Sequence, residues 1–387
     1  MMIARTAEKE LRNLSRQFKA IAIIGPRQSG KTTLAKHVFG HLPYINMENP
    51  DTRRFVLEDP RGFLNNYKSG AIFDEIQRTP ELFSYLQEIL DNAKSKGHFI
   101  LTGSNNFLLQ ENITQSLAGR IAYLTLLPFS LSELINLDVK SLNHQIFTGF
   151  YPPIYDQNIR PVKWYPNYIQ TYIEKDVRQI KNIYDLETFH RFIKLCAGRV
   201  GQLLNKNSIA IEAGIDGKTV DSWLGILESS FIIYRLFPHH KNYNKRMVKM
   251  PKIYFYDTGL LCNFLGLTEA SQIETHYFKG SIFENFIISD LLKTKFNHAI
   301  PANFFFWRDN VGHEIDLLIE EALNLLPLEI KAGKTIHSQF FKNLRYWLKL
   351  TGEKKGKIIY AGDDNQKRSE GIEIISWKSL PEMDSLV

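Results

Sequence analysis

The first 135 residues alternate between short apolar runs and segments with helical spacing. The apolar runs lie at 20–24, 71–73 and 99–101, and each is followed by polar or glycine-containing sequence. Such runs are typical of strands that are buried on both faces in a parallel sheet. The segments before residue 18 and after residue 33 have the three-to-four spacing of amphipathic helices. We therefore predict an α/β domain with a parallel sheet over residues 1–135.

The middle of the chain has a mostly helical pattern. Residues 136–200 contain one aromatic and proline-rich interruption at 149–153, and we expect them to form a helical lid. Residues 208–221 then predict two helices around a glycine-bearing turn, and a strand follows at 231–236. This order is that of a winged helix, which we assign to a connector over residues 201–268.

The connector has two alternative roles. Its basic loop at 239–246 could contact phosphates as the wing of a DNA-binding module. Its second helix, however, carries Asp221 and Glu228 and only Lys218 as a cation. The recognition helix of a DNA-binding module usually offers more hydrogen-bond donors to the base edges. A structural or protein-docking role is therefore at least as plausible.

The last part of the chain, residues 269–387, again mixes helix and strand patterns. A helix, three strands, a second helix and a fourth strand are predicted in that order, at 281–292, 303–308, 314–319, 326–332, 340–350 and 357–360. We therefore predict a second α/β domain at the C-terminus.

Composition and charge narrow the class of protein. The chain has 387 residues, of which 44% are hydrophobic and 23% charged, which is ordinary for a globular protein with two or three domains. We find no apolar run of ~20 residues and no signal-peptide pattern, so we expect a cytoplasmic protein without a membrane partner. The two cysteines, Cys196 and Cys262, have no zinc-ligand or disulfide spacing. A net charge of +7 permits nucleic-acid binding without requiring it.

Residues 25–32 fit the phosphate-binding pattern G-x-x-x-x-G-K-[ST] at every fixed position, between a predicted strand and a predicted helix. In such a loop, backbone N–H groups and a helix N-terminus surround an anion. We expect Lys31 to reach the β- and γ-phosphates of ATP and Thr32 to hold Mg²⁺. The expected nucleotide-binding residues are Gly25, Pro26, Arg27, Gln28, Ser29, Gly30, Lys31, Thr32 and Thr33.

The apolar run at 71–73 ends in two acids, Asp74 and Glu75. Its distance from the phosphate-binding loop suits another strand of the same sheet. After such a loop, the first acid is expected to bind Mg²⁺ through water, and the second to orient and deprotonate the attacking water. We therefore assign Asp74 to the metal and Glu75 to catalysis.

Two further catalytic positions are expected. The run at 99–101 continues into polar residues, of which Ser104 is the first candidate to sense the γ-phosphate, with Thr102 and Asn105 as alternates. Arg120 is the candidate for a phosphate-facing arginine, in its own subunit or a neighbouring one, and Arg178 is a second candidate. Simpler roles remain open, because polar residues often cap strands and arginines often pair with acids of their own domain.

These motifs resemble those of AAA-type P-loop ATPases, in a prokaryotic family that joins such a domain to a C-terminal domain of unknown function. The resemblance covers nearly the whole chain, and it implies ATP and Mg²⁺ as ligands. Only the phosphate-binding loop and the Asp74–Glu75 pair are chemically specific. The segments that carry the resemblance are 25–32, 74–77, 101–104, 117–120, 127–134, 168–178 and 251–260.

The C-terminal domain resembles the restriction-endonuclease-like PD-(D/E)xK fold. Asp316 and Glu329 fall on adjacent predicted strands and could share Mg²⁺, while the period of two places Lys331 on the same face as Glu329. The metal and Lys331 would then activate water against a phosphodiester, and Glu284 would add a carboxylate from the helix. The same fold could also be kept as a binding scaffold that cleaves nothing.

Two functional hypotheses follow, and both include ATP hydrolysis. In the first, the ATPase couples nucleotide state to the binding or processing of DNA through the nuclease-like domain. In the second, the chain is a nucleotide-dependent molecular switch that recruits a protein partner or a second copy of itself. DNA-stimulated turnover and a steep salt dependence of DNA binding would favour the first.

Overall fold

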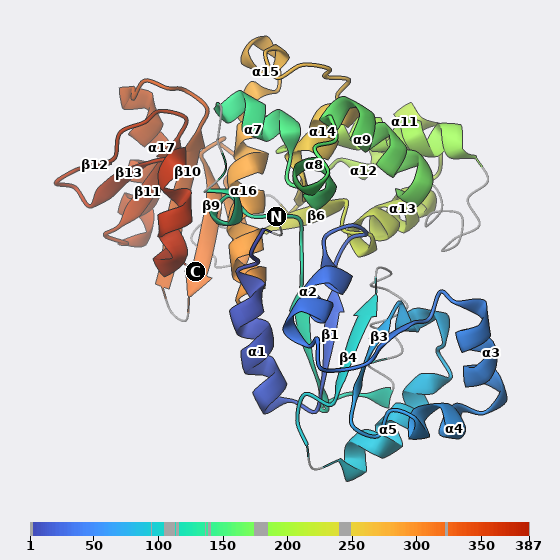
Figure 1. Cartoon of the computed structure of the whole chain (residues 1–387). Coiled ribbons are helices and arrows are strands. Elements are labelled where there is room, and N and C mark those ends of the chain that lie inside the picture. Colours follow the sequence, from blue (N-terminus) through green and yellow to red (C-terminus); the bar gives the residue numbers. More distant parts are fainter. Residues whose placement is uncertain are drawn as a thin grey trace.

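The computed structural model describes residues 3–93, 95–103, 113, 116–135, 137, 141–173, 185–239, 249–321 and 324–386. Figure 1 shows two lobes, with the N-terminal residues in the lower one and the middle and C-terminal residues in the upper one. Within the described part of the chain, no helix is both long and apolar enough to cross a bilayer.

The lower lobe contains a five-stranded sheet in the order β2-β3-β4-β1-β5, with all neighbours parallel. Its strands are β1 (Ala20–Ile24), β2 (Tyr44–Asn46), β3 (Ala71–Asp74), β4 (Phe99–Gly103) and β5 (Ile121–Thr125). The helices of this lobe are α1 (Ala7–Gln17), α2 (Lys31–Val38), α3 (Pro50–Glu58), α4 (Pro60–Asn65) and α5 (Leu82–Asn92). The expected α/β domain with a parallel sheet is confirmed.

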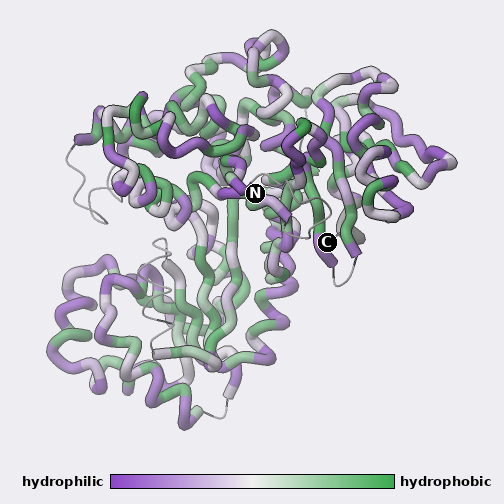
Figure 2. Tube along the Cα trace, turned by 180° about the vertical axis from the view of Figure 1, so that it is seen from behind, coloured by the Kyte–Doolittle hydropathy of each residue, from purple (hydrophilic) through white to green (hydrophobic). Residues whose placement is uncertain are grey.

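The period of two along β1 divides the core of this lobe between the two faces of the sheet. Ala20 and Ala22 pack in the cluster that includes residues of α4 and α5, whereas Ile21 and Ile23 pack in the cluster that includes residues of α1 and α2. Figure 2 shows these strands as an apolar centre surrounded by more hydrophilic segments. Helices on both faces explain why the strands read as continuous apolar runs.

The upper lobe begins with α7 (Leu142–Thr148), α8 (Pro152–Asp156), α9 (Pro161–Tyr168), a π-helical segment (Ile169–Ile173) and α11 (Leu186–Ala197). These are followed by α12 (Lys206–Ala213), α13 (Gly217–Ser229), β6 (Ile233–Pro238), β7 (Lys252–Phe255), α14 (Thr258–Phe264) and α15 (Gln272–Thr275). Helix, turn, helix and an antiparallel strand pair therefore occur in the order expected for the connector. Its assignment as a winged helix stays a prediction.

Asp257, at the start of α14, joins the lid to the rest of the upper lobe. Its side chain is buried and accepts hydrogen bonds from Phe150 N (2.8 Å), Tyr165 Oη (2.7 Å) and Leu260 N (2.9 Å). Gly149 precedes this contact with φ +67°, and a Cβ there would lie 2.0 Å from Tyr165 Oη. Only glycine fits both the backbone angle and the close approach.

The C-terminal elements are α16 (Lys279–Asn297), β8 (Phe304–Arg308), β9 (Glu314–Glu321), β10 (Asn324–Lys331), α17 (Lys342–Thr351), β11 (Gly356–Tyr360), β12 (Gln366–Lys367) and β13 (Ile372–Ser376). With β6 and β7 they form an eight-stranded mixed sheet in the order β12-β13-β11-β10-β9-β8-β6-β7. The one strand expected in the connector, observed as β6, and its partner β7 are thus continuous with the C-terminal sheet, through pairing of Phe237 and Pro238 with Phe305 and Phe306.

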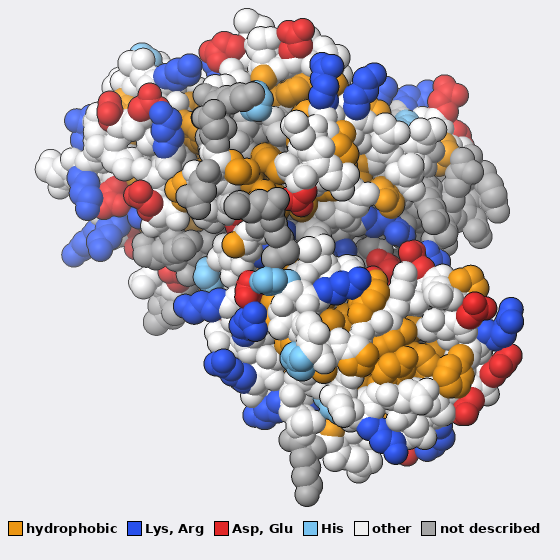
Figure 3. All heavy atoms as spheres, viewed as in Figure 1, with side chains coloured by type: hydrophobic (Ala, Val, Ile, Leu, Met, Phe, Trp, Pro, Cys, Tyr) orange, Lys and Arg blue, Asp and Glu red, His pale blue; other side chains and the backbone are white. Residues whose placement is uncertain are grey.

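The lid, the connector and one face of the C-terminal sheet share a single apolar core. Helix α16 contributes Phe283, Phe286 and Ile287 to it and also contacts α1 and β5 of the lower lobe. Helix α17 covers the other face of the sheet. On the outer surface, Figure 3 shows hydrophobic side chains gathered on one face of the lower lobe. Phe55 and Leu57 of α3 are among the exposed hydrophobic residues of this lobe.

Candidate functional site

The phosphate-binding loop joins the carboxyl end of β1 to the start of α2. Its first glycine, Gly25, has φ +148°, and a Cβ there would lie 2.1 Å from the carbonyl oxygen of Leu126. Its last glycine, Gly30, has φ +94° and lies directly before α2. Both glycines therefore meet backbone demands that other residues would strain, which accounts for their fixed places in the motif.

Lys31 is 6% exposed at the first position of α2. Its Nζ donates hydrogen bonds to the carbonyl oxygens of Gly25 (2.9 Å) and Pro26 (2.6 Å). The ammonium thus lies inside the curve of the loop, where the phosphates of a nucleotide are expected. Contact of this side chain with phosphates stays a prediction.

Asp74 lies at the end of β3 and links three elements of the site. Its Oδ1 accepts hydrogen bonds from Thr32 Oγ1 (2.8 Å) and from Thr102 Oγ1, and its Oδ2 accepts one from Tyr44 Oη (2.7 Å). Burial, together with the hydrogen bond to Asp74 and the charge of Asp74, raises the pKa of Tyr44. The Thr32–Asp74 pair expected to hold Mg²⁺ therefore exists, and Thr102 joins it.

Glu75 is the next residue, and its backbone is left-handed, with φ 55° and ψ 41°. This conformation is uncommon for a residue with a side chain and often marks a functional position. The Glu75 carboxylate accepts a hydrogen bond from Gln77 Nε2. A turn directly after the strand therefore places the second acid at the same sheet edge as Asp74.

Arg5 contacts the loop from outside, and no sequence motif predicted this role. Its guanidinium donates to the carbonyl oxygens of Ser29 (2.8 Å) and Leu127 (2.7 Å) and to Glu133 Oε1 (3.0 Å). The arginine is therefore engaged by the loop backbone and by a buried carboxylate. A cavity of about 280 Å³ beside it is lined by loop residues that include Gln28, Gly30 and Thr33.

Arg120 lies at the opposite end of the sheet from the phosphate-binding loop. Its carbonyl accepts from Ala20 N at the start of β1, whereas the loop follows the end of that strand, ~15 Å further on. Its guanidinium forms a two-point ion pair with Asp91. The structure thus corrects the expectation that this arginine could serve the nucleotide of its own chain. A role across a subunit boundary stays a prediction.

Three expected positions fall outside the described residues: Ser104, its alternate Asn105 and the second arginine candidate, Arg178. Thr102, the other alternate, is the one that the structure places beside Asp74. The helical lid contacts the loop through Tyr172, whose hydroxyl accepts from Gln28 Nε2 (2.7 Å).

A comparison with known protein families finds a match for most of the lower lobe. Residues 17–135 match the AAA domain family. They form an AAA-type P-loop domain, as the resemblance implied. Residues 139–271 and 279–380 match two domains of unknown function, DUF8612 and DUF4143. The resemblance of the last region to nucleases is not tested by these matches and stays a prediction.

Several known proteins are similar over most of the chain. An uncharacterized protein of Mycobacterium tuberculosis is 29% identical over 399 residues, covering 99% of this chain and 87% of the relative. An uncharacterized protein of Methanocaldococcus jannaschii is 23% identical, covering 78% and 72%. Among solved structures, a Walker-type ATPase of Pyrococcus abyssi has 15% identity and a TM-score of 0.47, covering 68% of this chain and 96% of that one.

The second expected site lies on the C-terminal sheet, where β9 and β10 bring Asp316, Glu329 and Lys331 together. Lys331 Nζ lies 3.2 Å from Asp316 Oδ2 and also donates to Glu329 Oε2. Burial and the charge of Asp316 raise the pKa of Glu329 well above its usual range. Burial opposes the ionisation of Asp316, but the charges of Lys331 and Lys252 outweigh it and lower the pKa. The expected trio is therefore assembled.

Glu284 differs from its expected role as a further metal-binding carboxylate. Its Oε1 is engaged by Lys252 Nζ (3.1 Å) and by Tyr254 Oη. Burial, partly offset by Lys252, raises the pKa of Glu284 to about 7. Across the described residues, no group of three or more His, Cys, Asp and Glu side chains is arranged to hold a metal ion. The structure thus joins Asp316 and Glu329 through Lys331, whereas Glu284 pairs with Lys252 and Tyr254.

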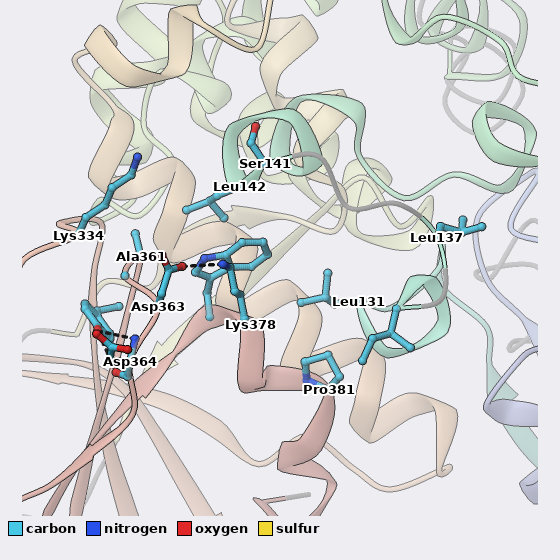
Figure 4. Close-up of a pocket in the computed structure, with 14 residues that line it drawn as sticks. Leu131, Leu137, Ser141, Leu142, Lys334, Ala361, Asp363, Asp364, Lys378 and Pro381 are labelled. Atoms are coloured by element: carbon cyan, nitrogen blue, oxygen red, sulfur yellow. Dashed lines mark hydrogen bonds and ion pairs between the residues drawn. The ribbon is translucent and has the colours of Figure 1, made fainter.

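A larger cavity, of about 720 Å³, is lined by none of the candidate site residues, although Tyr360 and Ala361 in its lining lie beside Lys331 on the neighbouring strand. It is lined by Leu131 near the end of the AAA domain, by Leu142 of α7, and by Lys378 and Pro381 near the end of the C-terminal domain. Figure 4 shows these side chains around the cavity, with Lys378 paired to Asp363. The size of this cavity does not make it the functional site, because the residues with nucleotide chemistry lie elsewhere.

Proposed function

We propose that the chain binds ATP with Mg²⁺ and hydrolyses the nucleotide at the AAA-type domain. The single observation that carries this proposal is the convergence at one sheet edge of the loop lysine and the Thr32–Asp74 pair. Lys31 and Thr32 follow the end of β1, and Asp74 ends β3. The chemistry of these side chains suits a nucleoside triphosphate with its metal. An ammonium can bind phosphate oxygens, and hard oxygen ligands can bind the metal.

The roles of the residues follow from their chemistry. Lys31 would exchange its two backbone carbonyl partners for phosphate oxygens, which are stronger acceptors because they are charged. Thr32 and Asp74 would hold Mg²⁺, whose charge offsets that of the phosphates. Glu75 would orient the attacking water and take its proton, which requires the acid to lie beside the metal-binding pair but outside it.

Glu75→Gln is expected to bind ATP and fail to turn it over. The amide keeps the shape of the carboxylate but cannot accept a proton, so kcat should fall by about 100- to 10,000-fold. Phosphate release from ATP with Mg²⁺ measures this. Glu58→Gln, an exposed acid at the end of α3, is the matched control and should behave as wild type. Equal turnover by Glu75→Gln and wild type would assign the water-activating role to another residue.

For the C-terminal domain we propose, as a second function, metal-dependent action on nucleic acid by Asp316, Glu329 and Lys331. Glu329 is 1% exposed, and its Oε1 has no hydrogen-bond partner among the described residues. Burying a carboxylate oxygen without a hydrogen bond or a cation beside it costs free energy. The donor set therefore fits one divalent cation, which would supply the charge needed to activate water.

Asp316→Asn should remove a Mn²⁺ site that is independent of the nucleotide. We would measure Mn²⁺ binding by electron paramagnetic resonance without ATP, on a Lys31→Ala background, with exposed Asp364→Asn as the control. Lys331→Ala should keep the metal and lose any cleavage of linear, branched or single-stranded DNA. Identical Mn²⁺ binding with and without Asp316 would contradict the metal site. Binding without cleavage would favour the alternative, a nucleotide-dependent switch with an inert scaffold.

A further inference from the structure

The C-terminal acidic centre consists of Glu284, Glu314, Asp316 and Glu329 with their partners. It also contains a buried lysine, Lys252, which lies outside the predicted nuclease-like domain in the sequence. It is the first residue of β7, which joins the eight-stranded sheet through β6, and it is 2% exposed. Its Nζ lies 3.1 Å from Glu284 Oε1 and forms an ion pair with Glu314 Oε1. The ammonium thus lies between two carboxylates, one from helix α16 and one from strand β9.

The counter-charges divide the centre into two unequal halves. In the half around Lys252, Glu284 also accepts from Tyr254 Oη, and Glu314 Oε2 pairs with Arg308 (3.0 Å). In the other half, Lys331 bridges Asp316 and Glu329, but Glu329 Oε1 has no hydrogen-bond partner among the described residues. One half is therefore neutralised by the protein itself, and the other retains a buried oxygen that can accept a ligand.

We propose that the Lys252 ammonium is a fixed internal cation, which occupies between Glu284 and Glu314 the place that a second divalent ion would need. The inference rests on the proposed metal binding only where it assigns an ion to Asp316 and Glu329. The centre accordingly takes a single divalent cation, at the Asp316–Glu329 half. Lys252 is a positioning residue, because it acts by holding the two glutamates.

Charge and space together exclude a divalent ion from the place that the Lys252 ammonium occupies. Two carboxylates that face one another in a buried place need a cation between them, since each unpaired charge is costly to bury. An ammonium supplies one positive charge through hydrogen bonds, whereas a divalent ion coordinates the same oxygens at ~2.1 Å and would have to displace it. Both cannot occupy the place between Glu284 and Glu314 at once. Removing the lysine side chain should therefore create an ion site.

The test counts bound Mn²⁺ on the Lys31→Ala background without nucleotide, by electron paramagnetic resonance. We expect one ion in the parent and two in Lys252→Ala, and the added ion should disappear when Glu314→Gln is combined with it. Lys249→Ala, an exposed lysine three residues earlier, is the matched control and should bind as the parent does. An unchanged ion count in folded Lys252→Ala would overturn the proposal.

The two proposals fail in different ways. If the parent binds no ion and Lys252→Ala binds one that depends on Glu314, the role of Lys252 holds and the Asp316–Glu329 metal site fails. If both proteins bind one ion that depends on Asp316, the metal site holds and the role of Lys252 fails. If Lys252→Ala is unfolded without metal, Mn²⁺ should refold it, and a chain that stays unfolded in saturating Mn²⁺ would contradict the inference.

Discussion

Lys31→Ala is expected to lower the affinity for ATP by at least about 100-fold, and turnover should be lost with it. The side chain is held inside the loop by two carbonyl oxygens and has the charge that phosphates require. Each hydrogen bond between charged groups contributes about 1.5–3 kcal/mol, and this lysine is expected to reach two phosphates. Calorimetric titration with ATP and Mg²⁺ measures the change directly.

The matched control for this variant is Lys68→Ala, an exposed lysine of the same domain that lies outside the loop. It should bind ATP as the wild type does. A melting curve without nucleotide should show both variants folded. If Lys31→Ala bound ATP as tightly as Lys68→Ala, the loop would not be the nucleotide site.

Lys293→Met is expected to stabilise the protein near neutral pH. Lys293 is fully buried in α16, its Nζ has no hydrogen-bond partner among the described residues, and it lies 3.7 Å from the centre of the Phe150 ring. Burial lowers the pKa of Lys293 to about 8, although the charges of Asp257 and Asp290 oppose the shift. Compared with an ordinary value of 10.5, this costs about 3 kcal/mol when the folded protein must carry the charge.

The pH dependence distinguishes this mechanism from a simple packing effect. Below pH 8 the lysine is charged in both the folded and unfolded states, so its full cost is present. Between pH 8 and 10.5 the unfolded chain still binds the proton and the folded one does not, so the stability of the wild type should rise toward that of Lys293→Met. Denaturant unfolding at several pH values, with exposed Lys163→Met as control, measures this. A difference that stays constant with pH would exclude the proposed cause.

Much of the nucleotide site could be predicted because its functional residues lie in short local segments of the sequence. The glycines, Lys31 and Thr32 lie within one loop, and Asp74 ends an apolar strand of the same parallel sheet, so sheet topology alone brings them together. The trio of the C-terminal domain was predictable for the same reason, since strand period and adjacency fix the positions of Glu329 and Lys331.

The residues that the sequence did not reveal act through contacts between distant segments. Arg5 reaches Ser29 and Glu133, and Lys252 contacts Glu284 from a strand that the sequence analysis did not predict, within the residues assigned to the connector. No local pattern distinguishes such a charged residue from an exposed one. The opposite error occurred at Arg120, for which the sequence suggested a role at the nucleotide. The structure pairs this arginine with Asp91 on a preceding helix.

The central claim is that the AAA-type domain binds ATP through Lys31 and hydrolyses it through Glu75. One calorimetric series tests it most directly: ATP with Mg²⁺ titrated into wild type, Lys31→Ala and Glu75→Gln. The account predicts tight binding by wild type and Glu75→Gln, with heat from continuing turnover in the wild type alone, and no measurable binding by Lys31→Ala. Equal binding by wild type and Lys31→Ala, or equal turnover by wild type and Glu75→Gln, would contradict it.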